Sequence, residues 1–136
     1  EGALDAVAVA SGMAAASAIL LTVLSAGDHV ILSEVCYAGI AELARDTLPR
    51  FGVAVSFVDT SDLEALQAAM RRETRLIMVD TPCNPILRLT DIAGAAGIFL
   101  VVRPEIVLRP SKTVLNLAAV AIFVAVVAAT LPLLLT

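Results

Sequence analysis

A turn of small residues near the start of the chain has the residue types and spacing needed to hold an anion. Residues 11–17 read Ser-Gly-Met-Ala-Ala-Ala-Ser and open an apolar stretch that is typical of a buried helix. Backbone N–H groups at a helix start carry the positive end of the helix dipole, and Gly12 lets an anion approach them without a Cβ in the way. Two interpretations remain open: a phosphate cradle at Gly12 and Met13, or a plain helix start capped by Ser11.

A second group of polar residues follows an apolar run. Residues 80–85 read Asp-Thr-Pro-Cys-Asn-Pro and come directly after the run 76–79. In open parallel sheets, ligands gather at the carboxyl ends of the strands, so Asp80 and Asn84 are candidates to contact one. Asn84 is equally well explained as a turn residue before proline. Tyr37, the only tyrosine, could stack on a ring or be a half-buried side chain.

Composition excludes several classes of function. The 136 residues fit one domain, but 60% hydrophobic residues, 16% charged residues and a mean hydropathy of +0.96 are more apolar than an ordinary soluble domain. A net charge of -4 and 4% aromatic residues argue against a nucleic-acid partner. His29, Cys36 and Cys83 lack the spacing of metal ligands, so we expect no metal site and a structural role for His29.

The elements that must position these residues alternate along the chain. Capping residues and apolar periodicity predict helices over 12–25, 36–48, 61–70 and 91–96, and strands over 29–32, 53–58, 75–80 and 98–102. Gly27 is expected to supply the left-handed position that ends the first helix. Alternating elements with near-continuous apolar strands predict an α/β fold with a parallel sheet and helices on both faces.

The C-terminal part of the sequence changes character. We predict an α/β domain over 1–102, a basic linker over 103–113 and an apolar helix over 114–136, a segment without any charged residue. Such a helix is about 34 Å long, enough to span a bilayer. The basic residues that precede it would leave the domain on the cytoplasmic side, as in a tail-anchored protein. A central buried helix, or a truncated, fused or frame-shifted product, are the alternatives.

Six short motifs follow one another along the chain. They are Ser11-Gly12-Met13-Ala14-Ala15, Gly27-Asp28-His29-Val30, Cys36-Tyr37-Ala38-Gly39, Phe57-Val58-Asp59, Thr74-Arg75-Leu76-Ile77, and Asp80-Thr81-Pro82-Cys83-Asn84-Pro85 followed by Asp91-Ile92. In this order and near this spacing, the chain resembles the pyridoxal-phosphate enzymes of Cys/Met metabolism over about residues 1–96. That family includes cystathionine γ-synthase, cystathionine γ-lyase, methionine γ-lyase and the O-acetylhomoserine sulfhydrylases.

The resemblance implies a fold, a cofactor and roles for particular residues. It implies part of the large domain of the aspartate-aminotransferase-like fold, with pyridoxal 5′-phosphate as cofactor. By resemblance, the N–H groups of Gly12 and Met13 hold the phosphate, Tyr37 stacks on the pyridine ring, and Asn84 lies near the phenolic oxygen. Asp80 stands where the family more often has glutamate. The resemblance further implies a sulfur-containing or activated homoserine substrate, a homo-oligomer and a cytoplasmic location.

After residue 92 the chain departs from the family pattern. The family continues with a strand ending in Val-Val-Asp-Asn, whose aspartate pairs with the pyridine nitrogen, whereas here Arg103 follows and would oppose ring protonation. The family's Schiff-base lysine stands in a Ser-x-Thr-Lys segment. The only lysine here, Lys112, is a candidate for that role, but it is better explained as a basic residue flanking an apolar helix.

Two functional hypotheses follow from the sequence. The first is an enzyme of trans-sulfuration type, catalysing β/γ-elimination or replacement, present as an incomplete and inactive fragment. The second is a non-catalytic, membrane-anchored remnant or a fusion product.

Overall fold

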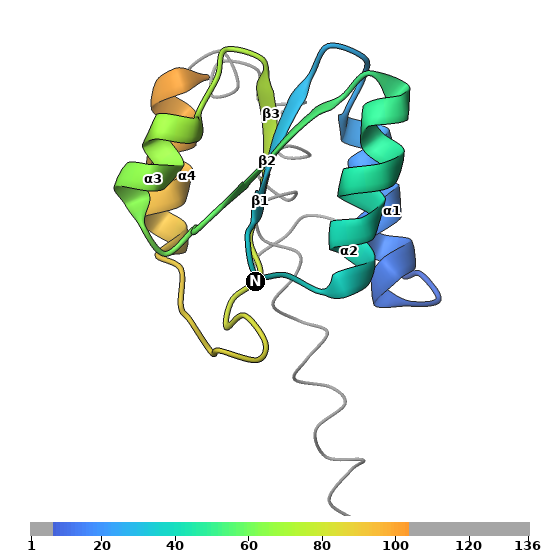
Figure 1. Ribbon diagram of the computed structural model, residues 1–136, viewed down its shortest axis with the longest axis horizontal. Helices are drawn as coiled ribbons and strands as arrows, with labels where there is room; N and C mark the ends of the chain where they lie inside the picture. The colour runs from blue at the N-terminus through green and yellow to red at the C-terminus, as the bar shows by residue number, and fades with distance from the viewer. Residues whose placement is uncertain (1–6, 104–136) are drawn as a thin grey trace, which may run out of the picture.

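The computed structural model describes residues 7–103, in which helices pack on both faces of a small sheet (Figure 1). Its elements are α1 (Gly12–Val23), β1 (His29–Ser33), α2 (Ala38–Glu42), a π-helical turn (Leu43–Thr47), a 3₁₀ turn (Leu48–Phe51), β2 (Ala54–Val58), α3 (Leu63–Ala69), β3 (Thr74–Met78) and α4 (Ile92–Val102). Lys112 and the apolar segment 114–136 lie outside the described residues. Within 7–103, no helix combines the length and the apolar character that crossing a bilayer requires.

The sheet is parallel, with β1 in the middle. The strand order is β2-β1-β3, and β1 pairs with β2 in the register His29↔Ala54 to Ser33↔Val58. Every residue of β1 is buried, which is the pattern of a strand covered on both faces. The predicted class, an α/β fold with a parallel sheet, is confirmed.

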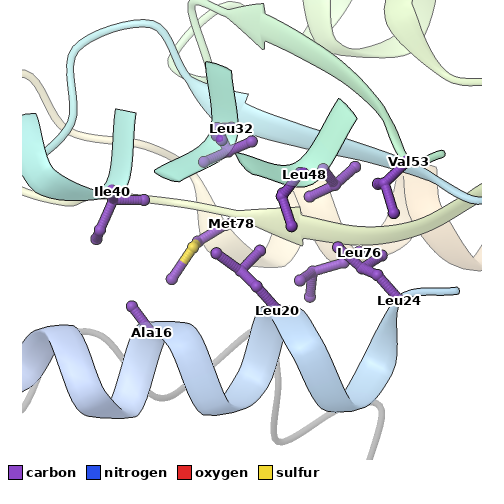
Figure 2. Close-up of a cluster of buried hydrophobic side chains, with 11 residues drawn as sticks. Ala16, Leu20, Leu24, Leu32, Ile40, Leu48, Val53, Leu76 and Met78 are labelled. Carbon is purple, nitrogen blue, oxygen red and sulfur yellow. The ribbon is translucent and has the colours of Figure 1, made fainter. Parts of the chain in front are cut away.

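Two hydrophobic clusters lie on opposite faces of the sheet. Val30 and Leu32 of β1 belong to the cluster beneath α1 and α2, whereas Ile31 belongs to the cluster beneath α3 and α4, as the two-residue period of a strand requires. Figure 2 shows Leu20 of α1 directed toward Met78 and Leu76 in the first cluster. The sheet is therefore covered by helices on both faces, as predicted.

The predicted strand over 98–102 is wrong, because these residues complete α4. Asp91 caps this helix by accepting a hydrogen bond from the Gly94 N–H at 3.0 Å. Ala95 and Phe99, one helical turn apart, are buried against the sheet. The β-branched run at its end favours a strand locally, but burial of this helical face decides the structure.

Gly27 also has a different role from the one predicted. α1 ends at Val23 with Leu24 as its cap, so Gly27 does not terminate the helix. Its φ of 90° places it in the left-handed region within the turn that leads to β1. There its N–H donates to the Gly52 carbonyl at 2.8 Å, which joins the two turns preceding β1 and β2.

His29 ties the three strands together at the amino edge of the sheet. Its side chain is fully buried; Nδ1 lies 2.8 Å from Thr74 Oγ1 and Nε2 lies 2.9 Å from Ser56 Oγ. Burial, and then the nearby charge of Arg71, lowers the pKa of His29. Because both ring nitrogens have partners within the sheet, His29 has a structural role.

Candidate functional site

The beginnings of all four described α-helices lie at the carboxyl edge of the sheet (Figure 1, lower edge of the view). This follows from the parallel topology: α2, α3 and α4 each start where the preceding strand has ended, and α1 runs back along the sheet to the start of β1. The loop 79–91, which leaves β3, lies at the same edge. Helix N-termini concentrate N–H donors and positive dipole ends there, which suits an anionic ligand.

The start of α1 leaves two backbone donors available. Ser11 is the N-cap, and its Oγ accepts from the Ala14 N–H at 3.1 Å while its carbonyl accepts from the Ala15 N–H at 3.0 Å. The N–H groups of Gly12 and Met13 are the first two of the helix and have no acceptor within residues 7–103. A capping serine and a pair of free donors therefore occur together in this turn.

Tyr37 stands at the N-cap of α2, with its side chain 60% exposed. Its carbonyl accepts from the N–H groups of Ile40 and Ala41, which begins the helix. A Cβ placed on Gly39 would lie 3.0 Å from Cε1 of Tyr37 and 3.0 Å from Sδ of Met13. The side chains of Tyr37 and Met13 thus both border the Cα of Gly39, and the structure brings together the starts of α1 and α2.

Asp80, which follows β3, contacts the backbone of Tyr37. Its Oδ2 accepts from the Tyr37 N–H at 3.2 Å, and its own N–H donates to Ser33 Oγ at 3.1 Å. Burial raises the pKa of the Asp80 carboxyl, and the hydrogen bond from Tyr37 partly opposes that shift. The sequence predicted a cofactor contact for Asp80, and the structure shows its carboxylate on the backbone of the predicted stacking residue.

Asn84 lies at this edge on an exposed turn. The turn is closed by a hydrogen bond from the Leu87 N–H to the Cys83 carbonyl at 2.6 Å and by one from the Cys83 N–H to the Arg88 carbonyl at 3.0 Å. The peptide bonds before Pro82 and Pro85 are cis. Among the predicted site residues, Tyr37 and Asp80 are joined by a hydrogen bond and Met13 and Tyr37 both border Gly39, whereas Asn84 shares their edge through the loop.

Sequence reasoning missed a charged cluster at the same edge. Arg88 Nη1 lies 2.8 Å from Glu34 Oε1 and 2.5 Å from Asp59 Oδ2. The pKa of Arg88 is raised by its hydrogen bonds to the two carboxylates, and the bond to Glu34 has the larger effect. The pKa of Asp59 is lowered, mainly by the hydrogen bond from the Ser61 side chain and then by the one from Arg88. Glu34 directly follows β1 and Asp59 directly follows β2, and that shared position is the signal that could have identified them.

This cluster borders a small cleft. Hydroxyl groups continue the polar contacts along it, because Thr60 Oγ1 lies 2.8 Å from Ser33 Oγ and 2.9 Å from Thr90 Oγ1. The lining residues are Ser33, Glu34, Val35, Val58, Asp59, Thr60, Asp80, Cys83, Arg88 and Thr90. The loop 79–91 is thereby fastened to the ends of β1 and β2.

Arg103 lies far from this edge, which overturns the expectation that it would oppose protonation of a cofactor ring. α4 begins at the carboxyl edge and runs back toward the amino edge, so its last residue is carried to the opposite end of the sheet (Figure 1). There the buried Arg103 Nη1 donates to the carbonyls of Arg72 at 2.9 Å and Thr74 at 3.1 Å. Its charge stabilises the start of β3.

These features fit a ligand that carries both a phosphate and an aromatic ring. The two free N–H groups at the start of α1 suit the phosphate, and the exposed Tyr37 ring beside Met13 offers a face for stacking. The class is thus a parallel α/β layer that gathers helix N-termini and an exposed tyrosine at the carboxyl edge of its sheet. The chain belongs to the Cys/Met metabolism PLP-dependent enzyme family, whose profile matches residues 1–107, and pyridoxal 5′-phosphate is the cofactor of that family.

Individual relatives agree with this assignment. The chain is 45% identical over 92 residues to an L-methionine gamma-lyase of Fusobacterium nucleatum subsp. nucleatum, covering 68% of this chain and 23% of that protein. It is 42% identical over 98 residues to an O-succinylhomoserine sulfhydrylase of Pseudomonas aeruginosa, covering 72% of this chain and 24% of that protein. The chain spans about a quarter of the length of these relatives.

Solved structures show the same fold. The crystal structure of metB from Corynebacterium glutamicum matches with a TM-score of 0.63 and 40% identity, over 65% of this chain and 23% of that one. A cystathionine gamma-lyase from Lactobacillus plantarum, complexed with L-serine, matches with a TM-score of 0.60 and 39% identity, over the same shares of the two chains. The α/β layer of residues 7–103 therefore matches part of larger pyridoxal-phosphate enzymes.

Proposed function

We propose that this chain supplies a cofactor-binding edge for a pyridoxal-phosphate enzyme that eliminates or replaces a group at the β or γ carbon of an amino acid. The substrate class is a sulfur-containing amino acid or an activated homoserine, which agrees with the names of the relatives. The observation that carries the proposal is the placement of Met13 and Tyr37 on either side of the bare Cα of Gly39, at the same edge as the free donors of α1. A cytoplasmic homo-oligomer is part of the same proposal.

Each of these residues has a distinct part in binding. The N–H groups of Gly12 and Met13 would bind the phosphate without any charged side chain, and the macrodipole of α1 would favour the anion. Tyr37 would stack on the ring and exclude water from one of its faces. Bound pyridoxal phosphate supplies an electron sink for charge that develops at the substrate's α carbon.

We further propose that residues 7–103 bind the cofactor but do not catalyse the reaction by themselves. An amine that attaches the cofactor is needed for this chemistry, and residues 7–103 contain no lysine. Lys112 is the only lysine of the chain and lies outside the described residues. Incubation of the Lys112→Ala chain with cofactor and with cystathionine, methionine or an acylated homoserine should therefore release no keto acid, and turnover by this variant would contradict this part of the proposal.

A substitution at Gly12 tests the phosphate site. Gly12→Pro deletes one N–H donor at the first helical position, where proline is well tolerated, and Ser11 already has the extended backbone that a residue before proline requires. Gly12→Ala keeps the donor and is the matched control. Titration with pyridoxal phosphate is followed by the fluorescence of Tyr37, because the chain has one tyrosine and no tryptophan.

The expected result is a difference that depends on the phosphate group. Gly12→Pro should bind pyridoxal phosphate about tenfold more weakly than Gly12→Ala, the effect of one charge-assisted hydrogen bond, because both variants add a Cβ and only the proline variant lacks the donor. Pyridoxal, which lacks the phosphate, should bind weakly and equally to all three proteins. Equal binding of pyridoxal and pyridoxal phosphate by the unsubstituted chain would contradict a phosphate site at α1.

A further inference from the structure

The backbone of Tyr37 is held by a side chain from another strand end. The Tyr37 carbonyl is used by α2, and no side-chain hydrogen bond from Tyr37 caps that helix. The N–H of Tyr37 donates to Asp80 Oδ2 at 3.2 Å. We propose that Asp80 is a positioning residue, which fixes the Tyr37 ring in place by holding this N–H. The inference deepens the proposed function and rests on it for the role of the ring.

Asp80 is itself well anchored. Its N–H donates to Ser33 Oγ at 3.1 Å, and Ser33 Oγ lies 2.8 Å from Thr60 Oγ1. Ser33 and Thr60 are both 4% exposed, so these contacts are shielded from water. The residue whose carboxylate holds Tyr37 is thus linked by hydrogen bonds to the end of β1 and, through Ser33, to the residues that follow β2. Because Asp80 is fixed to the sheet, it can hold Tyr37, at the start of α2, in a defined position relative to the strands.

An exposed ring needs such support more than a buried one. Tyr37 is 60% exposed, so packing against other side chains confines its ring little. The ring direction therefore depends on where the Cα of Tyr37 is held. Two backbone anchors, one to α2 and one to Asp80, fix that position from opposite sides of the residue. Removal of Asp80 leaves only the helix anchor.

The chain offers a direct reporter for this effect. Because Tyr37 is the only tyrosine and tryptophan is absent, the tyrosine band of the near-ultraviolet circular dichroism spectrum reports the fixed orientation of this one ring. The whole chain is compared with Asp80→Ala, which loses the acceptor, and with Asp80→Asn, whose amide oxygen can still accept. Asp46→Ala removes an exposed carboxylate of the Leu43–Thr47 turn and is the matched control.

We expect a loss of ring order without a loss of fold. Asp80→Ala should reduce the tyrosine band by at least about half and speed hydrogen exchange of the Tyr37 amide about tenfold, with the far-ultraviolet spectrum unchanged. Asp80→Asn and Asp46→Ala should both retain the band. An unchanged band in Asp80→Ala, or an equal loss in Asp80→Asn, would overturn the proposal. Should Asp80→Ala not fold, a Tyr37 amide that exchanges in the unsubstituted chain as fast as an unbonded one would overturn it.

Cofactor binding separates this inference from the proposed function. Asp80→Ala should bind pyridoxal phosphate about tenfold more weakly than the unsubstituted chain, while Asp80→Asn stays close to it. If the unsubstituted chain binds no cofactor, the proposed function fails, but the near-ultraviolet and exchange results still decide whether Asp80 positions Tyr37. If Asp80→Ala loses affinity with the ring order intact, Asp80 contacts the cofactor directly and the positioning role is wrong.

Discussion

Gly39→Ala should change stability and cofactor affinity in opposite directions. Gly39 lies in α2, where replacing glycine by alanine favours the helix by up to about 1 kcal/mol. The new Cβ would lie 3.0 Å from Tyr37 Cε1 and Met13 Sδ, roughly half an ångström short of ordinary contact. Both neighbours can move, because the thioether is flexible and the ring is exposed. We therefore expect unchanged or slightly raised stability and a displaced ring.

The displaced Tyr37 ring should lower the affinity for the cofactor. An aromatic pair contributes about 0.5–1.5 kcal/mol beyond its buried area, so a displaced Tyr37 should weaken binding of pyridoxal phosphate about threefold to tenfold. Urea unfolding gives the stability, and quenching of Tyr37 fluorescence gives the affinity. Both measurements are made on the same preparations of the unsubstituted chain and the variant.

Gly97→Ala is the matched control for this substitution. Gly97 lies in α4, and a Cβ there would meet nothing within 4 Å, so the helix gains stability without touching the site. Gly97→Ala should raise the free energy of unfolding by up to about 1 kcal/mol and leave cofactor affinity unchanged. Full cofactor affinity in Gly39→Ala, or equal affinity losses in the two variants, would refute the reasoning that the bare Cα of Gly39 makes room for the ring.

Three further predictions concern the polar anchors of the fold. Because the pKa of His29 is lowered in the folded state, the unfolded chain binds the proton more strongly; stability should fall as the pH drops below about 6.5, and urea midpoints should show a weaker dependence in His29→Gln. Arg103→Met should cost about 1.5–3 kcal/mol in urea unfolding, because the carbonyls of Arg72 and Thr74 lose a charged donor and the Thr74 contact is buried, while a loss of cofactor affinity would contradict its place at the opposite edge. Arg88→Gln should increase hydrogen exchange at the Cys83 amide several-fold, because the loop 79–91 loses its ion pairs with the residues that follow β1 and β2. Arg75→Gln breaks an ion pair with Asp28, before β1, and should leave this exchange unchanged. Equal exchange in both variants would argue that the Arg88 ion pairs do not hold the loop.

The sequence was most informative where the deciding interactions are local. Asp62 and Asp91 cap α3 and α4 through hydrogen bonds that span three residues or fewer; neighbouring residues predict Asp91 for α4 and leave Ser61 or Asp62 for α3. The buried strand β1 was predictable from its continuous apolar run. In each case a short stretch contains the whole physical cause of the element.

Prediction failed where distant residues decide. The run from residue 98 to 102 has strand-forming composition, and only the burial of Ala95 and Phe99 against the sheet shows that it belongs to a helix. The ion pair between Glu34 and Arg88 joins residues 54 apart in the sequence. The contact of Asp80 with Tyr37 uses a backbone N–H, a donor that every residue except proline carries and that no sequence pattern singles out.

The central place of β1 has a consequence for how the chain is made. Of the three strands that the structure describes, β1 is synthesised first, but its partners are β2 and β3, and both pair with it in parallel. At about 5–20 residues per second, the end of β3 emerges roughly 45 residues, or about 2–9 seconds, after the end of β1. During that interval an apolar segment that is fully buried in the finished fold lacks one or both neighbours, and a nascent chain in this state is a substrate for chaperones.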